Sequence, residues 1–204
     1  MTEGFEHLQP LDLIGDRSVV IEIGPGYHPE QNMLERLENV DDLVSGKSLY
    51  VAIDDKSYNL EHVTHGVVTR MSLQDFASSD LHNGKAESIY IFNVFGEPFS
   101  SASDNGFHAE VFKGLGRKLQ TGGRIIIGEH ITPLRAAFLR EDLQRFRNIG
   151  LEPRLVTGYR DMLRELRELG FSVHYRNAFL GQSEENIRYE GPKAGGFLLI
   201  LTKI

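Results

Sequence analysis

The sequence predicts an α/β fold: a doubly wound, seven-stranded, mostly parallel sheet with helices on both faces. Short apolar runs rich in β-branched residues recur along the chain. Their nearly continuous apolar character is typical of strands that are covered on both faces. Amphipathic stretches separate most of these runs. Such alternation favours parallel strands that are joined by right-handed helical crossovers.

The elements follow in chain order. The apolar runs predict strands at 19–23, 49–53, 67–69, 89–94, 125–128, 171–175 and 197–202. Helical patterns predict helices at 29–37, 107–119, 134–149 and 158–169. Pro29 suits the first turn of its helix because the ring fixes φ. In the second helix, apolar side chains share one face, as expected for a helix that packs on a sheet: Phe107, Val111, Phe112, Leu115 and Leu119.

We expect residues 1–204 to form one domain. Two helices, rather than one, are predicted between the strand at 125–128 and the strand at 171–175. We interpret the segment 133–157 in one of two ways. It is either a helical lid over a substrate site or an ordinary packed helix whose arginine-rich face meets solvent.

Composition excludes several classes of protein. The chain has no cysteine, which excludes disulfides, thiolate catalysis and cysteine-ligated metal centres. No apolar run approaches the ~20 residues of a membrane helix, so no membrane partner is expected. The first ten residues show no signal-peptide pattern, and a cytoplasmic protein is the expectation. Oligomeric state cannot be read from the sequence.

The net charge of −7 is unevenly distributed: residues 1–110 are acidic on balance and residues 111–204 are basic. Such asymmetry can accompany a nucleic-acid partner. Because no segment is a basic run, we favour the interpretation that opposite charges meet on one folded surface.

The strongest functional signal follows the first strand, where the sequence reads EIGPGYHP over 22–29. Glycines let a ligand approach the backbone, and a helix N-terminus offers free N–H groups to an anion. Pro29 stands where a dinucleotide fingerprint needs its third glycine, so a ligand with a carboxylate and an ammonium fits better. The turn can take the carboxylate, while Glu22 helps hold the ammonium directly or through backbone and water. The contact residues expected here are Glu22, Gly24, Pro25, Gly26 and Tyr27.

A second signal follows the second strand, which ends in Asp54 and Asp55. An acid at this point of a βαβ unit can accept hydrogen bonds from two ribose hydroxyls. Asp54 directly follows the apolar run and is the first candidate, with Asp55 as the alternative. The long spacing from Gly26 predicts an inserted loop around 40–47.

These motifs resemble those of class I S-adenosylmethionine-dependent methyltransferases. VVIEIGPG resembles the first motif of that family, and YVAIDDKS resembles the second. FKGLGRKLQTGGRIIIGE resembles the helix, turn and fifth strand that follow the binding site. LRELGFSVHYRNAF and GGFLLILTKI resemble the last helix and the closing hairpin. The resemblance covers roughly residues 15–204 and implies the strand order 3-2-1-4-5-7-6 with the seventh strand antiparallel.

The resemblance implies S-adenosylmethionine as cofactor and S-adenosylhomocysteine as its product. His28 replaces the third motif glycine of the family. After the third strand, Met71 or Ser72 stands where the family often has an acid near the adenine. Asn93 ends the fourth strand, in a stretch that is not the signature of enzymes that methylate nucleobase amino groups.

The implied reaction is methyl transfer to an O or N atom of a small-molecule acceptor. A general base would help, and histidine suits neutral pH. We rank His130 first, then His108 and His28; each has the alternative of a surface histidine. Asn93 and Glu129 fall where related O-methyltransferases hold magnesium, but their Asp-rich pattern is missing, so no metal is expected. Aromatic side chains that either line a pocket or belong to the core are Phe92, Phe95, Phe99, Phe107 and Tyr159.

Other functions compete with this one. The chain could be a catalytically inactive protein that binds S-adenosylmethionine or S-adenosylhomocysteine, or a partner-binding protein, with His28 blocking the donor site. It could also be an RNA methyltransferase, with the basic half of the chain binding RNA. Aminopropyl transfer wants an acid-rich pocket, for which NVFGEP supplies only Glu97.

Overall fold

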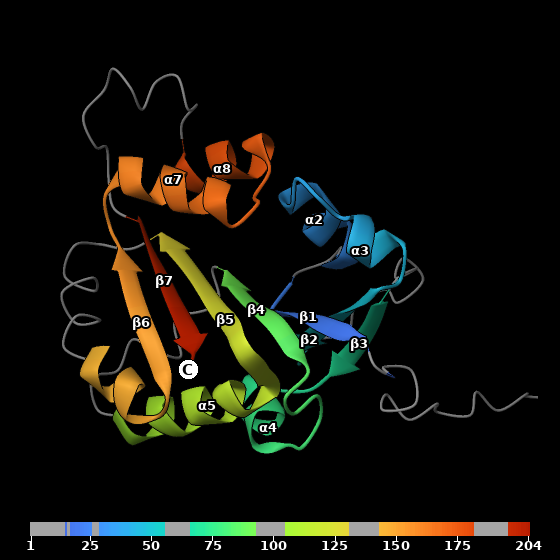
Figure 1. Ribbon diagram of the computed structural model, residues 1–204, viewed down its shortest axis with the longest axis vertical. Helices are drawn as coiled ribbons and strands as arrows, with labels where there is room; N and C mark the ends of the chain where they lie inside the picture. Colours follow the sequence, from blue (N-terminus) through green and yellow to red (C-terminus); the bar gives the residue numbers. More distant parts are fainter. Residues whose placement is uncertain are drawn as a thin grey trace, which may run out of the picture.

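A seven-stranded sheet forms the centre of the protein (Figure 1). The computed structural model describes residues 15, 17–25, 29–55, 66–92, 105–130, 143–181 and 196–204. The strand order is β3-β2-β1-β4-β5-β7-β6. β1 to β5 are mutually parallel, and β7 is antiparallel to both β5 and β6. The predicted fold class and the strand order implied by the family resemblance are both confirmed.

Strands and helices follow one another along the described parts of the chain. The strands are β1 (Ser18–Ile23), β2 (Ser48–Asp54), β3 (Gly66–Arg70), β4 (Ala86–Phe92), β5 (Leu119–His130), β6 (Leu151–Val156) and β7 (Gly196–Lys203). The helices are α2 (Pro29–Arg36), α3 (Asp41–Val44), α4 (Leu73–Ser78), α5 (Asn105–Lys118), α7 (Tyr159–Glu168) and α8 (Val173–Leu180). Residues 143–148 are also helical. None of the helices within the described ranges is long and apolar enough to cross a membrane.

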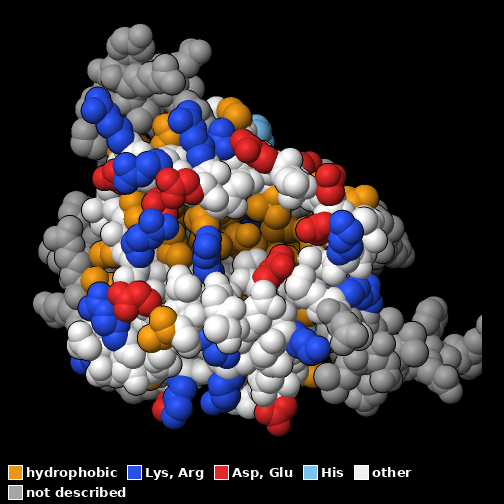
Figure 2. All heavy atoms as spheres, viewed as in Figure 1, with side chains coloured by type: hydrophobic (Ala, Val, Ile, Leu, Met, Phe, Trp, Pro, Cys, Tyr) orange, Lys and Arg blue, Asp and Glu red, His pale blue; other side chains and the backbone are white. Residues whose placement is uncertain are grey.

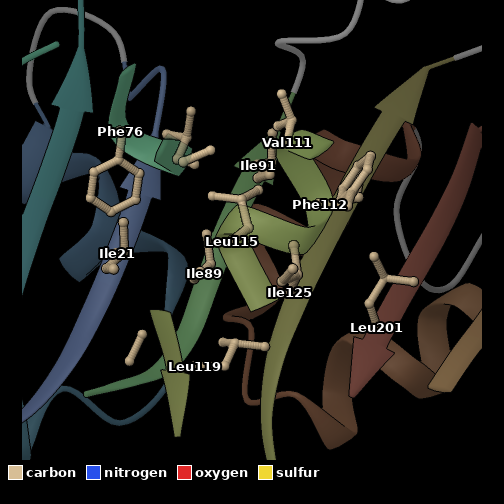
Figure 3. Packing of buried hydrophobic residues seen from close by; sticks show 14 of the residues in the cluster. Ile21, Phe76, Ile89, Ile91, Val111, Phe112, Leu115, Leu119, Ile125 and Leu201 are labelled. Atoms are coloured by element: carbon tan, nitrogen blue, oxygen red, sulfur yellow. The ribbon is translucent and has the colours of Figure 1, made fainter. Parts of the chain in front are cut away.

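The helices lie in two layers, one on each face of the sheet (Figure 1). On the α5 face, helices α4 and α5 pack on alternate strand residues. Figure 3 shows Val111, Phe112 and Leu115 of α5 meeting Ile91 and Ile125 of the sheet. On the α2–α8 face, helices α2, α3, α7 and α8 cover the other set of strand residues, which includes Val20, Ala52, Tyr90, Ile126 and Leu198. Burial on both faces explains why the strand sequences are nearly continuous in apolar character.

The prediction of a strand at 171–175 is wrong. Phe171 forms only an isolated bridge with Leu37, and the next residues form α8. Ser172 caps this helix by accepting a hydrogen bond from the N–H of Tyr175, and Gly181 ends it in the left-handed conformation. The aromatic residues at 171, 175 and 179 follow a spacing of four, which is the spacing of one helix face.

The sixth strand is instead β6, a segment for which no strand was predicted. β6 separates the helix at 143–148 from α7, and the pair of helices that precedes the last strand is α7 and α8. Within the expected lid segment 133–157, residues 151–156 belong to the sheet. Phe146 packs edge-on against Phe112, with ring centroids 5.0 Å apart. Residues 131–142 lie outside the described part of the chain, so a lid there stays a prediction.

Candidate functional site

Four strands end side by side at the edge where the glycine turn lies. Ile23 of β1 is in register with Ile53 of β2 and with Ile91 of β4. The Gly24 N–H donates to the Ile53 carbonyl at 2.9 Å, and the Met71 N–H donates to the Asp54 carbonyl at 2.8 Å. The segments that follow β1, β2 and β3 are therefore held together at one edge. The sheet order reverses direction between β1 and β4, and ligands bind at such switch points in open α/β sheets.

The glycine turn begins in a conformation that favours glycine. Gly24 has φ +66°, where a side chain would be strained. Pro25 is buried. The turn leads into the first turn of α2, which begins at Pro29 as predicted. Gly26, Tyr27 and His28 lie outside the described residues, so their contacts with a cofactor stay predictions.

The acids after β2 lie beside this turn. Asp54 is the last residue of β2 and is half-buried, while Asp55 is exposed. The contact of Asp54, or alternatively Asp55, with a ribose stays a prediction.

The two residues after β3 differ in their surroundings. Met71 packs against the apolar cluster on the α5 face. Ser72 is the N-cap of α4: its Oγ accepts from the Asp75 N–H at 3.1 Å and donates to Asp75 Oδ2 at 2.7 Å. The Ser72 hydroxyl therefore has a structural role as a helix cap, and a contact of Met71 or Ser72 with an adenine stays a prediction.

Glu22 is buried below the glycine turn in a polar network. Its side chain is 2% exposed. Oε2 accepts a hydrogen bond of 2.7 Å from the Tyr50 hydroxyl, and Oε1 is paired with the Arg36 guanidinium of α2. The same guanidinium lies over the rings of Phe92 and Tyr175, 5.9 and 5.4 Å from their centroids. Sequence reasoning found Glu22 but missed Arg36 and Tyr50.

An aromatic cluster borders this network on the α2–α8 face. Phe92 ends the described part of β4 and meets the Phe171, Tyr175 and Phe179 rings edge to face, at centroid distances of 5.5 to 5.9 Å. Burial raises the pKa of Tyr175, opposed by the nearby Arg36, so this phenol stays protonated. Phe92 is core, and Tyr159 packs against the same cluster. Of the other aromatic residues proposed for a pocket, Phe95 and Phe99 lie outside the described residues, and the Phe107 side chain is not described.

The surface view shows a hollow near the same helices. In Figure 2, hydrophobic side chains form the floor of a depression at the centre of the view, between the layer that contains α7 and α8 and the body of the sheet. Charged side chains of both signs surround it.

The three candidate bases are placed only in part. His130 is the last residue of β5 and is in register with Gly196 of β7. His108 lies in the first turns of α5. For both residues only the backbone is described, and His28 and Asn93 are outside the described residues. Among the residues that are described, no group of three His, Asp or Glu side chains could hold a metal ion.

A different histidine carries a perturbed pKa. His82 precedes β4, at the opposite edge of the sheet from the glycine turn. It is 2% exposed, and neither ring nitrogen has a hydrogen-bond partner among the described residues. Burial, reinforced by the positive charge of Lys118, lowers its pKa to about 4. Its position makes it a structural group, not a base for the site.

No family model matches the chain, and no curated protein matches it. Solved structures do match over nearly the whole of both chains. An antibiotic-related methyltransferase is 12% identical with a TM-score of 0.57, covering 98% of this chain and 96% of its own. The aminoglycoside resistance methyltransferase NpmB1 is 15% identical with a TM-score of 0.56, with coverage of 95% and 91%.

A third match is the 16S rRNA (adenine(1408)-N(1))-methyltransferase of Catenulisporales acidiphilia, in a structure with its cosubstrate S-adenosylmethionine. It is 12% identical with a TM-score of 0.54, and the coverage is 98% of this chain and 93% of that one. These matches agree with the order of the seven strands and with the antiparallel β7. The chain therefore has the class I S-adenosylmethionine-dependent methyltransferase fold.

Proposed function

We propose that the protein is an S-adenosylmethionine-dependent methyltransferase that moves a methyl group to an O or N atom of a small-molecule acceptor. One observation carries the proposal: Gly24, Asp54 and Met71 are held side by side at the carboxyl edge of the sheet, beside the switch point between β1 and β4. A ligand that links an amino-acid group to a ribose needs backbone N–H groups for its carboxylate and an acceptor for its ribose hydroxyls. A glycine turn next to a strand-end carboxylate can supply both.

The residues at this edge fit the cofactor. The turn that begins at Gly24 would offer backbone N–H groups to the carboxylate, with Pro25, Gly26 and Tyr27 as its proposed neighbours. The Asp54 carboxylate would accept from the ribose hydroxyls, with Asp55 as the alternative. Met71 and Ser72 are proposed to lie near the adenine. Asn93, after β4, is proposed to lie beside the transferred group. When bound, the cofactor supplies a methyl group activated by its sulfonium.

The chain's own contribution to transfer is alignment and proton removal. A hydroxyl or ammonium acceptor must lose its proton near the transition state, and histidine is the side chain suited to this near neutral pH. We propose His130 first, because it ends β5 at the edge of the sheet where β4 also ends. His108, at the start of α5, and His28, on the first loop, follow.

RNA is the second candidate acceptor. The structural matches that cover nearly all of both chains include the 16S rRNA methyltransferase from Catenulisporales acidiphilia and the 16S rRNA methyltransferase KamB. The basic balance of residues 111–204 is compatible with such an acceptor. The two candidates differ in salt dependence, because RNA binding releases counterions and weakens steeply as salt rises.

Calorimetric titration with S-adenosylmethionine, S-adenosylhomocysteine and NADH tests the donor site. We expect micromolar binding of the two adenosyl ligands and none of NADH. Asp54→Ala should weaken adenosyl binding about tenfold or more, since each lost hydrogen bond to a charged group is worth roughly 1.5–3 kcal/mol. Asp42→Ala, which removes an exposed carboxylate that is paired with Lys47, is the matched control and should bind like the wild type.

Absence of adenosyl binding by the wild type would refute the proposal. Binding followed by transfer of a labelled methyl group to small phenols or amines would support it. Transfer to 30S ribosomal subunits instead would establish the RNA alternative. Binding with no transfer to either acceptor would favour an inactive binding protein.

A further inference from the structure

One buried ion pair ties helix α2 to the strand that leads into the glycine turn. Glu22 lies two residues before Gly24, and its carboxylate has partners on both oxygens: the Arg36 guanidinium and the Tyr50 hydroxyl. The carboxylate is 2% exposed and the Arg36 side chain 18%. A carboxylate that is so deeply buried needs a compensating charge, because desolvation of an unpaired ion costs several kcal/mol.

The Arg36 side chain also contacts the aromatic cluster on the α2–α8 face. Its guanidinium lies over the ring of Phe92, at the end of β4, and over the ring of Tyr175 in α8. A guanidinium stacked on aromatic faces is fixed in orientation as well as in charge. Arg36 thus contacts strands on both sides of the switch point, β1 through Glu22 and β4 through Phe92.

The backbone of the same helix end is also fixed. The Ser172 N–H donates to the Arg36 carbonyl at 2.6 Å, and the Glu38 N–H donates to the Gly170 carbonyl at 2.7 Å. Arg176 pairs with Glu38 at 2.6 Å. The end of α2 is therefore anchored to the α7–α8 junction, and the side chain of Arg36 reaches back from this anchored end to Glu22.

We propose that Arg36 is a positioning residue for the cofactor site, which acts by neutralising Glu22 and thereby setting where α2 begins relative to the glycine turn. The inference rests on the proposed function, since the ligand is the donor's amino-acid group. Both Glu22 oxygens have partners, so Glu22 acts on this group through the backbone of the turn. Direct contact with the ammonium would require the ion pair to open.

Binding of S-adenosylhomocysteine tests this role in four variants. Arg36→Met removes the charge but keeps length and apolar contact, and we expect affinity to fall about tenfold. Arg36→Lys restores the charge without the planar stack and should recover part of that loss. The double variant with Glu22→Gln and Arg36→Met leaves no buried charge to neutralise, so it should bind within about threefold of the wild type. Arg147→Met removes an exposed pair with Glu152 and is the matched control.

The pH dependence separates charge compensation from a merely structural role. In Arg36→Met, a proton can neutralise Glu22 when the pH is low. The ratio of dissociation constants between Arg36→Met and wild type should therefore shrink between about pH 8 and about pH 5.5. Because the ligand titrates equally in both titrations, its own protonation cancels in this ratio.

Each outcome decides the inference. Failure of the wild type to bind any adenosyl ligand overturns the proposed function and this inference together. Wild-type binding with unchanged affinity in Arg36→Met overturns the inference alone. If Arg36→Met does not fold, the double variant still decides. A double variant that folds and binds within about threefold of the wild type supports the role, because removing the Glu22 charge has then restored the fold. A folded double variant with a tenfold loss of affinity contradicts it.

Discussion

His82 is the group that should decide how the fold responds to mild acid. It lies in the turn before β4, close to Lys118 and Phe76. The centroids of the His82 and Phe76 rings are 6.3 Å apart. Neither ring nitrogen has a hydrogen-bond partner among the described residues. Burial first, and the Lys118 charge second, lower its pKa from 6.5 to about 4. Protonating His82 in the folded state would place a second positive charge beside Lys118 in a buried site.

The direction of the pH effect on stability follows from the linkage between folding and proton binding. The pKa of His82 is lower in the folded than in the unfolded chain, so the unfolded chain binds the proton more tightly. The stability that neutral His82 preserves is complete above about pH 6.5 and is lost as the pH falls toward about 4. At about 1.4 kcal/mol for each pH unit of that interval, the loss between about pH 7.5 and about pH 4.5 is roughly 2–3 kcal/mol.

Urea unfolding at these two pH values measures the effect. Carboxylates also titrate in this range, so the comparison must be made with a variant that lacks the imidazole. His82 has φ +58°, a conformation that asparagine tolerates better than most residues. His82→Asn therefore removes the titration with the least backbone strain. We expect the wild type to lose about 2–3 kcal/mol more than His82→Asn on acidification. If both proteins lose the same free energy of unfolding on acidification, His82 is not the group responsible for the difference.

Three glycine substitutions make further predictions about packing. A Cβ at Gly114 of α5 would lie well inside the van der Waals distance of the Ala77 backbone in α4, so Gly114→Ala should lower the free energy of unfolding by about 1–3 kcal/mol. At Gly116, two residues on, the nearest atom to an added Cβ is in the Leu151 side chain at 3.4 Å, which is ordinary van der Waals contact. Gly116→Ala should therefore raise the free energy of unfolding by about 0.5–1 kcal/mol through helix propensity. Gly128→Ala would drive a Cβ into the Phe92 ring and should be destabilising by about 1–3 kcal/mol. Denaturant midpoints check all three, and a Gly114→Ala variant as stable as Gly116→Ala would contradict the packing.

The parts of the fold that could be predicted from the sequence are those with a clear periodicity. Continuous apolar runs located β1, β2 and β3 to within about a residue, because burial on both faces leaves no other pattern for a short strand. β6 was missed because Pro153 interrupts it. A proline is tolerated there because β6 is an edge strand of the sheet. The run FSVHY was misread as a strand, although Ser172 is an N-cap and the aromatic residues recur every four positions.

The candidate site was predictable only where it depends on local geometry. A glycine turn after a strand and an acid after the next strand are short-range signals, and the parallel register brings them to one edge. The partner of Glu22 was not predictable in this way. Arg36 lies 14 positions along the chain, and the pairing arises because the crossover helix returns over its own strand. No spacing rule in the sequence reports that contact.

The two faces of the sheet bury different kinds of side chain. The α5 face is dominated by aliphatic side chains, and its buried cation, Lys118, has neutral partners, the Ser79 carbonyl and Asn83 Oδ1. On the α2–α8 face, ion pairs with a buried member recur: Glu22 with Arg36, Glu165 with Arg154, and Arg176 with Glu38.

Buried ion pairs add little net stability compared with apolar residues of the same volume, yet they allow few alternative arrangements. One of these pairs joins Arg36 of α2 to the sheet, and another joins Glu38, just after α2, to α8. If the proposed function holds, these contacts would hold one geometry at the end of the glycine turn, where a misplacement of about 1 Å is costly to a group-transfer reaction.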